Sequence, residues 1–95
     1  MNSEVLAKIT HRRRQLYVHS VIYYRHCASV ISDTQFDKWA YELAELQREY
    51  PTEAESAVFA AEFAAWDGTS GFDLPWNPWA ERTAEYLIAE CAKRR

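Results

Sequence analysis

The sequence has few residues that interrupt helices, since its 95 positions include only two glycines and three prolines. Both glycines and two of the prolines fall within 67–78, which is therefore the one substantial loop expected in the chain. No segment alternates apolar and polar residues over a useful length, and this argues against β-strands. The scarcity of breakers favours helices joined by short turns.

Cysteines and long apolar runs are scarce as well. Cys27 and Cys91 are too few for a disulfide framework, and no secretory signal follows the start of the chain. No apolar run approaches the roughly 20 residues that a membrane span requires. We therefore expect a cytoplasmic protein without membrane association, in which both thiols are reduced.

Neither sign of charge dominates the composition. The formal net charge is −3 and the isoelectric point is near 5.6. Sequence-specific nucleic-acid binding is not expected, because contacts to phosphates need a basic surface. Basic residues do gather at 11–14 and at Arg25, whereas 42–62 is acidic. Two interpretations stay open: solvated helix faces, or a site for an anion or an acidic partner.

Aromatic residues are abundant, at 15% of the chain within an apolar fraction of 48%. This content can fill one small core over 1–95 and leave some rings exposed as a contact surface. Apolar spacing predicts helices at 4–26, 32–50, 52–65 and 78–93. The predicted fold class is an all-α, single-domain bundle of about four helices. The first two helices should form an antiparallel hairpin, because the loop between them is short.

Local signals place the helix ends. Capping-box patterns, a Ser or Thr followed three residues later by Gln or Glu, begin at Ser32 and Thr52. Pro51 is expected to end the second helix. Asn77 should cap the last helix, with Pro78 at its first position. The first helix is apolar on more than one face near its C-terminal end, which predicts that this half is either sandwiched between other elements or covered by a later one.

A longer motif occupies positions 23–39, which read Tyr-Tyr-Arg-His-Cys-Ala-Ser-Val-Ile-Ser-Asp-Thr-Gln-Phe-Asp-Lys-Trp. It resembles the start of bacterial NAD-dependent DNA ligases. There, a helical subdomain carries a Tyr-His pair, a short loop, and then Ile-(Ser/Pro)-Asp-x-x-Tyr-Asp. The resemblance continues without a gap over 16–51 and ends in an acidic, leucine-rich helix and a proline. It implies a module that binds the nicotinamide mononucleotide half of NAD while a separate domain catalyses the reaction.

Carried across position by position, the resemblance implies a set of nucleotide-binding residues: Tyr23, Tyr24, Asp33, Phe36 and Asp37. Aromatic faces attract a cationic nicotinamide ring, and carboxylates accept hydrogen bonds from hydroxyl and carboxamide groups. The family has His at the position of Tyr24 and Tyr at the position of Phe36. Structural explanations also stay open, since Asp33 suits a first helical turn and Phe36 begins a buried stripe. Arg25, or an arginine within 12–14, is a candidate for the phosphate.

Ligase chemistry is not expected from the chain. Nucleotidyl transfer in the resembled family uses a lysine nucleophile in Lys-x-Asp-Gly on a large α/β domain. The lysines are Lys8, Lys38 and Lys93, and none stands in that context. The Asp-Gly pair at 67–68 has Ala65 at the lysine position. We therefore expect no enzyme activity, and 95 residues leave no room for the other ligase domains.

A different function also remains open for the part after Pro51, which lies outside the resemblance. Its aromatic loop predicts that Phe72 and Leu74 fold back onto the hairpin, while Trp76 and Trp79 are candidate anchors for a protein partner. The alternative is thus a small interaction or inhibitor module, for example a phage protein that acts on a host ligase or defence machine. No metal site is expected, because the histidines and cysteines match no zinc-binding spacing.

Overall fold

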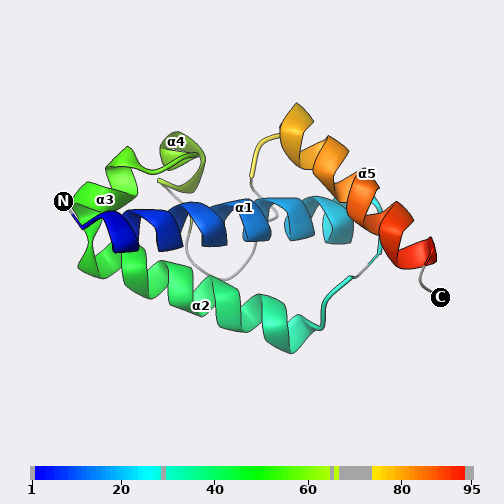
Figure 1. Ribbon diagram of the computed structural model, residues 1–95, viewed down its shortest axis with the longest axis horizontal. Helices are drawn as coiled ribbons and strands as arrows, with labels where there is room; N and C mark the ends of the chain where they lie inside the picture. The colour runs from blue at the N-terminus through cyan, green and yellow to red at the C-terminus, as the bar shows by residue number, and fades with distance from the viewer. Residues whose placement is uncertain (1, 29, 65, 67–73, 94–95) are drawn as a thin grey trace.

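The computed structural model describes residues 2–28, 30–64, 66 and 74–93. Within these ranges there are no strands and five helices: α1 (Ser3–Arg25), α2 (Asp33–Glu49), α3 (Pro51–Ser56), α4 (Ala60–Phe63) and α5 (Pro78–Lys93). Figure 1 shows α1 at the centre, α2 antiparallel beneath it, and α5 against the C-terminal half of α1. The predicted all-α bundle and its antiparallel first pair are confirmed.

The central helix is buried on several faces. Ile9 and Leu16 are at most 1% exposed, as is Tyr17, and the run from Val18 to Ile22 is buried apart from His19. These side chains meet α2 on one side of α1, and α3 and α5 on others. The prediction that other elements cover the first helix is thus confirmed. A helix that is apolar on several faces is stable when neighbouring helices remove those faces from water.

Local hydrogen bonds fix both ends of the connection between α1 and α2. Cys27 adopts φ 50°, in the left-handed region, and the Ala28 amide donates to the carbonyl of Ile22 at 3.1 Å. The chain thereby leaves the axis of α1 within three residues. At the other end, Ser32 Oγ accepts the amide of Gln35 at 3.1 Å, which confirms the predicted N-cap of α2.

The prediction of a third helix at 52–65 was wrong in two respects. Pro51 is the first residue of α3, where its fixed φ is favourable, so Thr52 lies inside the helix and is not its cap. The helical segment is also divided, since α3 ends at Ser56 and α4 begins at Ala60. Phe59, between them, has φ 63°. A non-glycine residue in this region is uncommon, and it interrupts a right-handed helix.

Tertiary contacts explain the break between α3 and α4. Arg13 reaches from α1 and donates through Nη1 to the carbonyls of Ala57 (3.3 Å) and Val58 (3.1 Å), which a continuous helix would use internally. The Phe59 ring lies against Tyr17, with centroids 4.9 Å apart. Packing therefore overrides the helical propensity of this alanine-rich segment.

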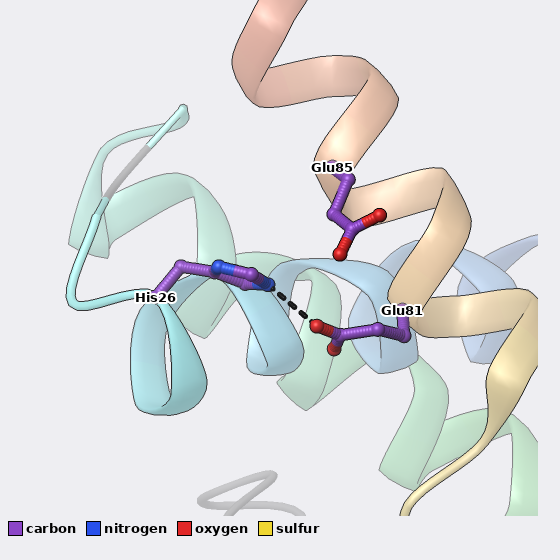
Figure 2. A group of neighbouring side chains, drawn as sticks. All are labelled: His26, Glu81 and Glu85. Atoms are coloured by element: carbon purple, nitrogen blue, oxygen red, sulfur yellow. Dashed lines mark hydrogen bonds and ion pairs between the residues drawn. The ribbon is translucent and has the colours of Figure 1, made fainter.

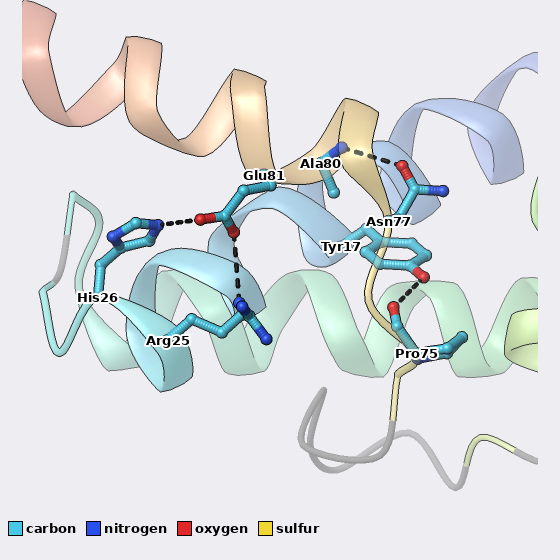
Figure 3. Close-up of polar contacts among 7 residues, drawn as sticks. All are labelled: Tyr17, Arg25, His26, Pro75, Asn77, Ala80 and Glu81. Carbon is cyan, nitrogen blue, oxygen red and sulfur yellow. Dashed lines mark hydrogen bonds and ion pairs between the residues drawn. The ribbon is translucent and has the colours of Figure 1, made fainter.

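The last helix begins as its sequence predicts. Asn77 Oδ1 accepts the Ala80 amide at 3.1 Å (Figure 3). Pro78 is the first helical residue. Ala80 and Ala84 are 0% exposed, so α5 contacts α1 through its smallest side chains. Ahead of α5, the Tyr17 hydroxyl donates to the carbonyl of Pro75.

The segment before α5 and the start of α5 contain four residues for which the sequence predicted a role. Leu74 packs against the core, as predicted, whereas Phe72 lies outside the described residues. Trp76 is 60% exposed and Trp79 is 41% exposed.

None of the helices described in the structure combines the length and the apolar character that a bilayer crossing requires.

The arginine run of α1 does not form a uniform basic surface. Arg12 Nε lies 3.2 Å from Glu42 Oε2, and Arg14 is exposed. Arg13 is 2% exposed and points into the bundle. Neither a solvated helix face nor a site for an anion or an acidic partner fits Arg13, because its guanidinium donates to backbone carbonyls between α3 and α4.

Candidate functional site

A pocket of about 230 Å³ lies where α1 ends and α2 begins. Its walls are the last turns of α1, residues 28 and 30–32 of the connection, and the first turns of α2. All five residues that the sequence proposed for nucleotide binding line it. The other lining residues are His19, Ile22, Ala28, Val30, Ile31 and Ser32.

The aromatic members form two different surfaces of this pocket. Tyr23 is 51% exposed and Tyr24 is 39% exposed, and their rings meet edge to face with centroids 4.9 Å apart. Phe36 comes from α2 and is partly buried against the core. It is therefore both a core residue, as its place in the apolar stripe suggested, and part of the pocket wall.

The two aspartates lie one turn apart on α2, so they share a helix face. Both are exposed where they line the pocket. Asp33 is the first residue of the helix, where the helix dipole favours negative charge. Asp37 follows a turn later, so its position is not explained by capping. Two solvated carboxylates beside aromatic faces can attract a cationic ring and accept hydrogen bonds from hydroxyl or amide groups.

His19 is a pocket residue that sequence reasoning did not include in the site. Burial lowers the pKa of its imidazole below the ordinary value of 6.5, so the ring is neutral at pH 7. It lies against Trp39, with ring centroids 5.6 Å apart, and its Nδ1 atom is buried without a hydrogen bond in the described part of the chain. Its spacing of four residues from Tyr23 on α1 was the signal available in the sequence.

None of the arginines proposed for a phosphate lines this pocket. Arg25 instead lines a neighbouring hollow of about 200 Å³, which also includes Tyr24 and Trp76. Its Nε atom lies 3.4 Å from Glu81 Oε2. The main pocket therefore offers aromatic faces and carboxylates, without a positive charge among its described lining residues.

The geometry defines a small helical bundle with a pocket at the connected end of the α1–α2 hairpin. A family model described as "DNA ligase-like, N-terminal NAD+-binding domain" matches residues 2–57. The chain therefore belongs to this family. The match covers α1, α2 and α3, and it extends at both ends beyond the 16–51 resemblance seen in the sequence. Neither a curated protein nor a solved structure matches the chain significantly.

Proposed function

We propose that the pocket between α1 and α2 recognises the nicotinamide mononucleotide half of NAD, and that the chain does so without catalysing a reaction. The observation that supports this proposal is the convergence of the five residues chosen from sequence on one pocket. Their elements belong to the part of the chain that matches a family of NAD⁺-binding domains. Residues separated by up to 14 positions meet there because the hairpin turns back between them.

Each group has a distinct part in the proposed complex. The faces of Tyr23, Tyr24 and Phe36 contact the nicotinamide ring, whose positive charge favours aromatic surroundings. Asp33 and Asp37 accept hydrogen bonds from ribose hydroxyls and the carboxamide. The neutral His19 adds no repulsion toward the cationic ring, since burial keeps its pKa low.

The size of the pocket limits the affinity. A volume of about 230 Å³ is below the ~300–1,000 Å³ of ordinary ligand pockets, so much of a nucleotide would remain in water. A small buried area contributes little beyond the entropic cost of association. We therefore expect a dissociation constant around the millimolar to high-micromolar range, or roughly 4–6 kcal/mol of binding free energy.

The absence of a nucleophile supports a binding role. None of Lys8, Lys38 and Lys93 lines the pocket, and none stands in Lys-x-Asp-Gly. Without an activated lysine there is no route to a covalent adenylate on this chain. Incubation with labelled NAD or ATP should leave the protein unmodified, and an adenylated lysine would contradict the proposal.

Titration with nicotinamide mononucleotide, followed by amide NMR, tests binding. Chemical shifts should move at 19–24 and 33–37 and saturate at millimolar ligand. Asp37→Asn should weaken binding at least fivefold, because one acceptor becomes an amide while the shape is kept. Glu49→Gln is the matched control, since it removes one charge from an exposed position at the other end of α2. No saturable shift, or equal loss in both variants, would overturn the proposal.

The two departures from the family pattern provide a complementary test. Phe36→Tyr restores the hydroxyl that the resembled ligases have, and Tyr24→His restores their imidazole. If the pocket binds the same nucleotide in the same way, the double variant should bind more tightly than the wild type. Unchanged or weaker binding would show that the pocket has a different ligand.

A second candidate function rests on the exposure of Trp76 (60%) and Trp79 (41%), at the start of the last helix. Exposed indoles are frequent anchors of protein interfaces. If this chain is an interaction module, a specific partner should be lost with Trp76→Ala and Trp79→Ala and kept with Asp37→Asn. The opposite pattern would assign the partner to the pocket.

A further inference from the structure

We propose that His26, Glu81 and Glu85 form a binding site for a divalent transition-metal ion, with Zn²⁺ as the best match. Each residue offers one ligand atom, and these atoms lie within 4.8 Å of one another. The site is separate from the nucleotide pocket, since none of the three lines it. Both glutamates lie beyond residue 57, outside the part of the chain that matches the family.

The fold brings these residues together from two helices. His26 is the C-cap of α1, immediately after its last residue. Glu81 and Glu85 are four residues apart on α5, so they occupy the same face. The buried Ala80 and Ala84 hold α5 close to α1. Figure 2 shows the two carboxylates directed toward the imidazole from one side.

The ligand atoms lie within reach of one metal ion after small rotations of the side chains. His26 Nε2 and Glu81 Oε1 are 2.9 Å apart. Zinc bonds to imidazole and carboxylate measure about 2.0–2.2 Å, so ligand atoms at the corners of a tetrahedron are separated by about 3.3–3.6 Å. A small outward rotation of His26 or Glu81 admits an ion between them. Glu85 is exposed and can rotate inward as the third ligand.

The two carboxylates of the cluster outnumber the arginine that contacts them in the described part of the chain. Two carboxylates one helical turn apart repel each other, and a bound cation removes that repulsion. Arg25 Nε lies 3.4 Å from Glu81 Oε2, the carboxylate oxygen that does not contact His26 (Figure 3). Oε2 is buried and accepts no hydrogen bond from the described residues, so Arg25 is its ionic partner. Arg25 therefore orients Glu81 as an outer partner and leaves Oε1 for the ion.

The donor set indicates the kind of ion. One imidazole nitrogen with two carboxylate oxygens suits Zn²⁺ and its first-row neighbours, whereas Ca²⁺ and Mg²⁺ prefer oxygen ligands and higher coordination numbers. Three protein ligands leave a fourth position for water. The bound ion would join the end of α1 to α5, two residues after the pocket residue Tyr24.

The test uses the Cys27→Ser/Cys91→Ser protein, because thiolates bind zinc independently of the proposed site. Zinc titration should show one equivalent by calorimetry, with amide shifts at 24–28 and 80–86. Glu85→Gln should reduce the affinity at least tenfold, and His26→Ala should remove it. Glu90→Gln is the matched control, since it removes the same charge from α5 outside the cluster and should change affinity less than twofold.

Several results would overturn the site. No binding at millimolar zinc would do so, as would equal effects of Glu85→Gln and Glu90→Gln, which indicate attraction to acidic surface in general. Circular dichroism of each variant verifies the fold. Asp37→Asn should bind zinc like its parent, so failure of the nucleotide proposal leaves this test unaffected.

Discussion

Replacement of the buried Arg13 by methionine should be strongly destabilising. The guanidinium donates through Nε to Gln47 Oε1 at 2.9 Å and through Nη1 to two backbone carbonyls at 3.1 and 3.3 Å. It also lies over the Phe63 ring, 5.6 Å from the centroid. Methionine retains most of the apolar stem but supplies no donor. The substitution thus removes three hydrogen bonds and leaves their acceptors in place.

The magnitude follows from two opposing terms. Hydrogen bonds to a charged group contribute about 1.5–3 kcal/mol each, and an unsatisfied buried acceptor such as the Ala57 carbonyl costs about 1–3 kcal/mol. The opposing term is that the variant no longer buries a charge. The cost of burying that charge is reflected in the pKa of Arg13, which desolvation lowers more than the nearby Glu62 raises it. We expect a net loss of about 2–4 kcal/mol in the free energy of unfolding. That is a large part of the ~5–15 kcal/mol that stabilises a domain.

Urea unfolding followed by circular dichroism measures this loss, and thermal unfolding should show a midpoint about 10–25 °C lower. Arg14→Met is the matched control, because Arg14 is the adjacent residue on α1 and is exposed. Its effect should stay within about 0.5 kcal/mol. Hydrogen exchange should accelerate most near the break at 57–59, where the acceptors of Arg13 lie.

Equal or greater stability of Arg13→Met would refute this reasoning. Buried ion pairs in other proteins can be replaced by apolar residues without loss, because removal of the desolvation cost compensates for the lost contacts. That outcome would mean that water or a rearranged backbone satisfies the Ala57 and Val58 carbonyls. It would also remove the explanation given above for the division between α3 and α4.

Three further predictions concern other contacts. Because burial lowers the pKa of His19, the unfolded chain binds more protons at this side chain below pH 6.5, so the free energy of unfolding should fall on acidification through that range. One side chain contributes at most about 1.4 kcal/mol per pH unit to this slope, and His19→Phe should remove that contribution. Tyr17→Phe removes the hydrogen bond from the hydroxyl to the carbonyl of Pro75, and the effect should be modest because Pro75 is exposed. Urea unfolding should show a free energy of unfolding that is lower by about 0.5–1.5 kcal/mol. Ala84→Leu should cost about 1–3 kcal/mol by overpacking at the α1–α5 contact, and unchanged thermal stability would contradict that contact.

Local signals predicted the elements whose ends are determined by nearby residues. Ser32 caps α2 and Asn77 caps α5, since each cap depends on a side chain and an amide three residues away. The break after α3 was not predictable in this way. It depends on Arg13, which lies more than 40 positions earlier, and on the ring of Tyr17 against Phe59. An alanine-rich segment contains no local sign of such distant contacts.

The same distinction applies to the sites. The five proposed pocket residues lie within one contiguous motif, so a hairpin of known direction was enough to place them on one pocket. His26, Glu81 and Glu85 combine positions separated by more than 50 residues. Their proximity depends on how α5 crosses α1, which apolar periodicity does not specify. The sequence therefore predicted no metal site, because the histidines and cysteines match no zinc-binding spacing.

The part of the chain beyond the family match bears directly on the pocket. Glu81 lies 2.9 Å from His26 and 3.4 Å from Arg25, the two residues that follow Tyr24. Ala80 and Ala84 keep α5 against α1, so these contacts of Glu81 hold the last turn of α1 from the side opposite to α2 (Figure 1). In an isolated hairpin this turn would end without that support, and helix ends fray. We therefore expect the orientation of Tyr23 and Tyr24 in the pocket to depend on α5, and Glu81→Gln should weaken nucleotide binding although Glu81 does not line the pocket. Amide NMR titration of this variant, with Glu90→Gln as the control, measures the effect, and equal affinities would show that α1 alone orients the two tyrosines.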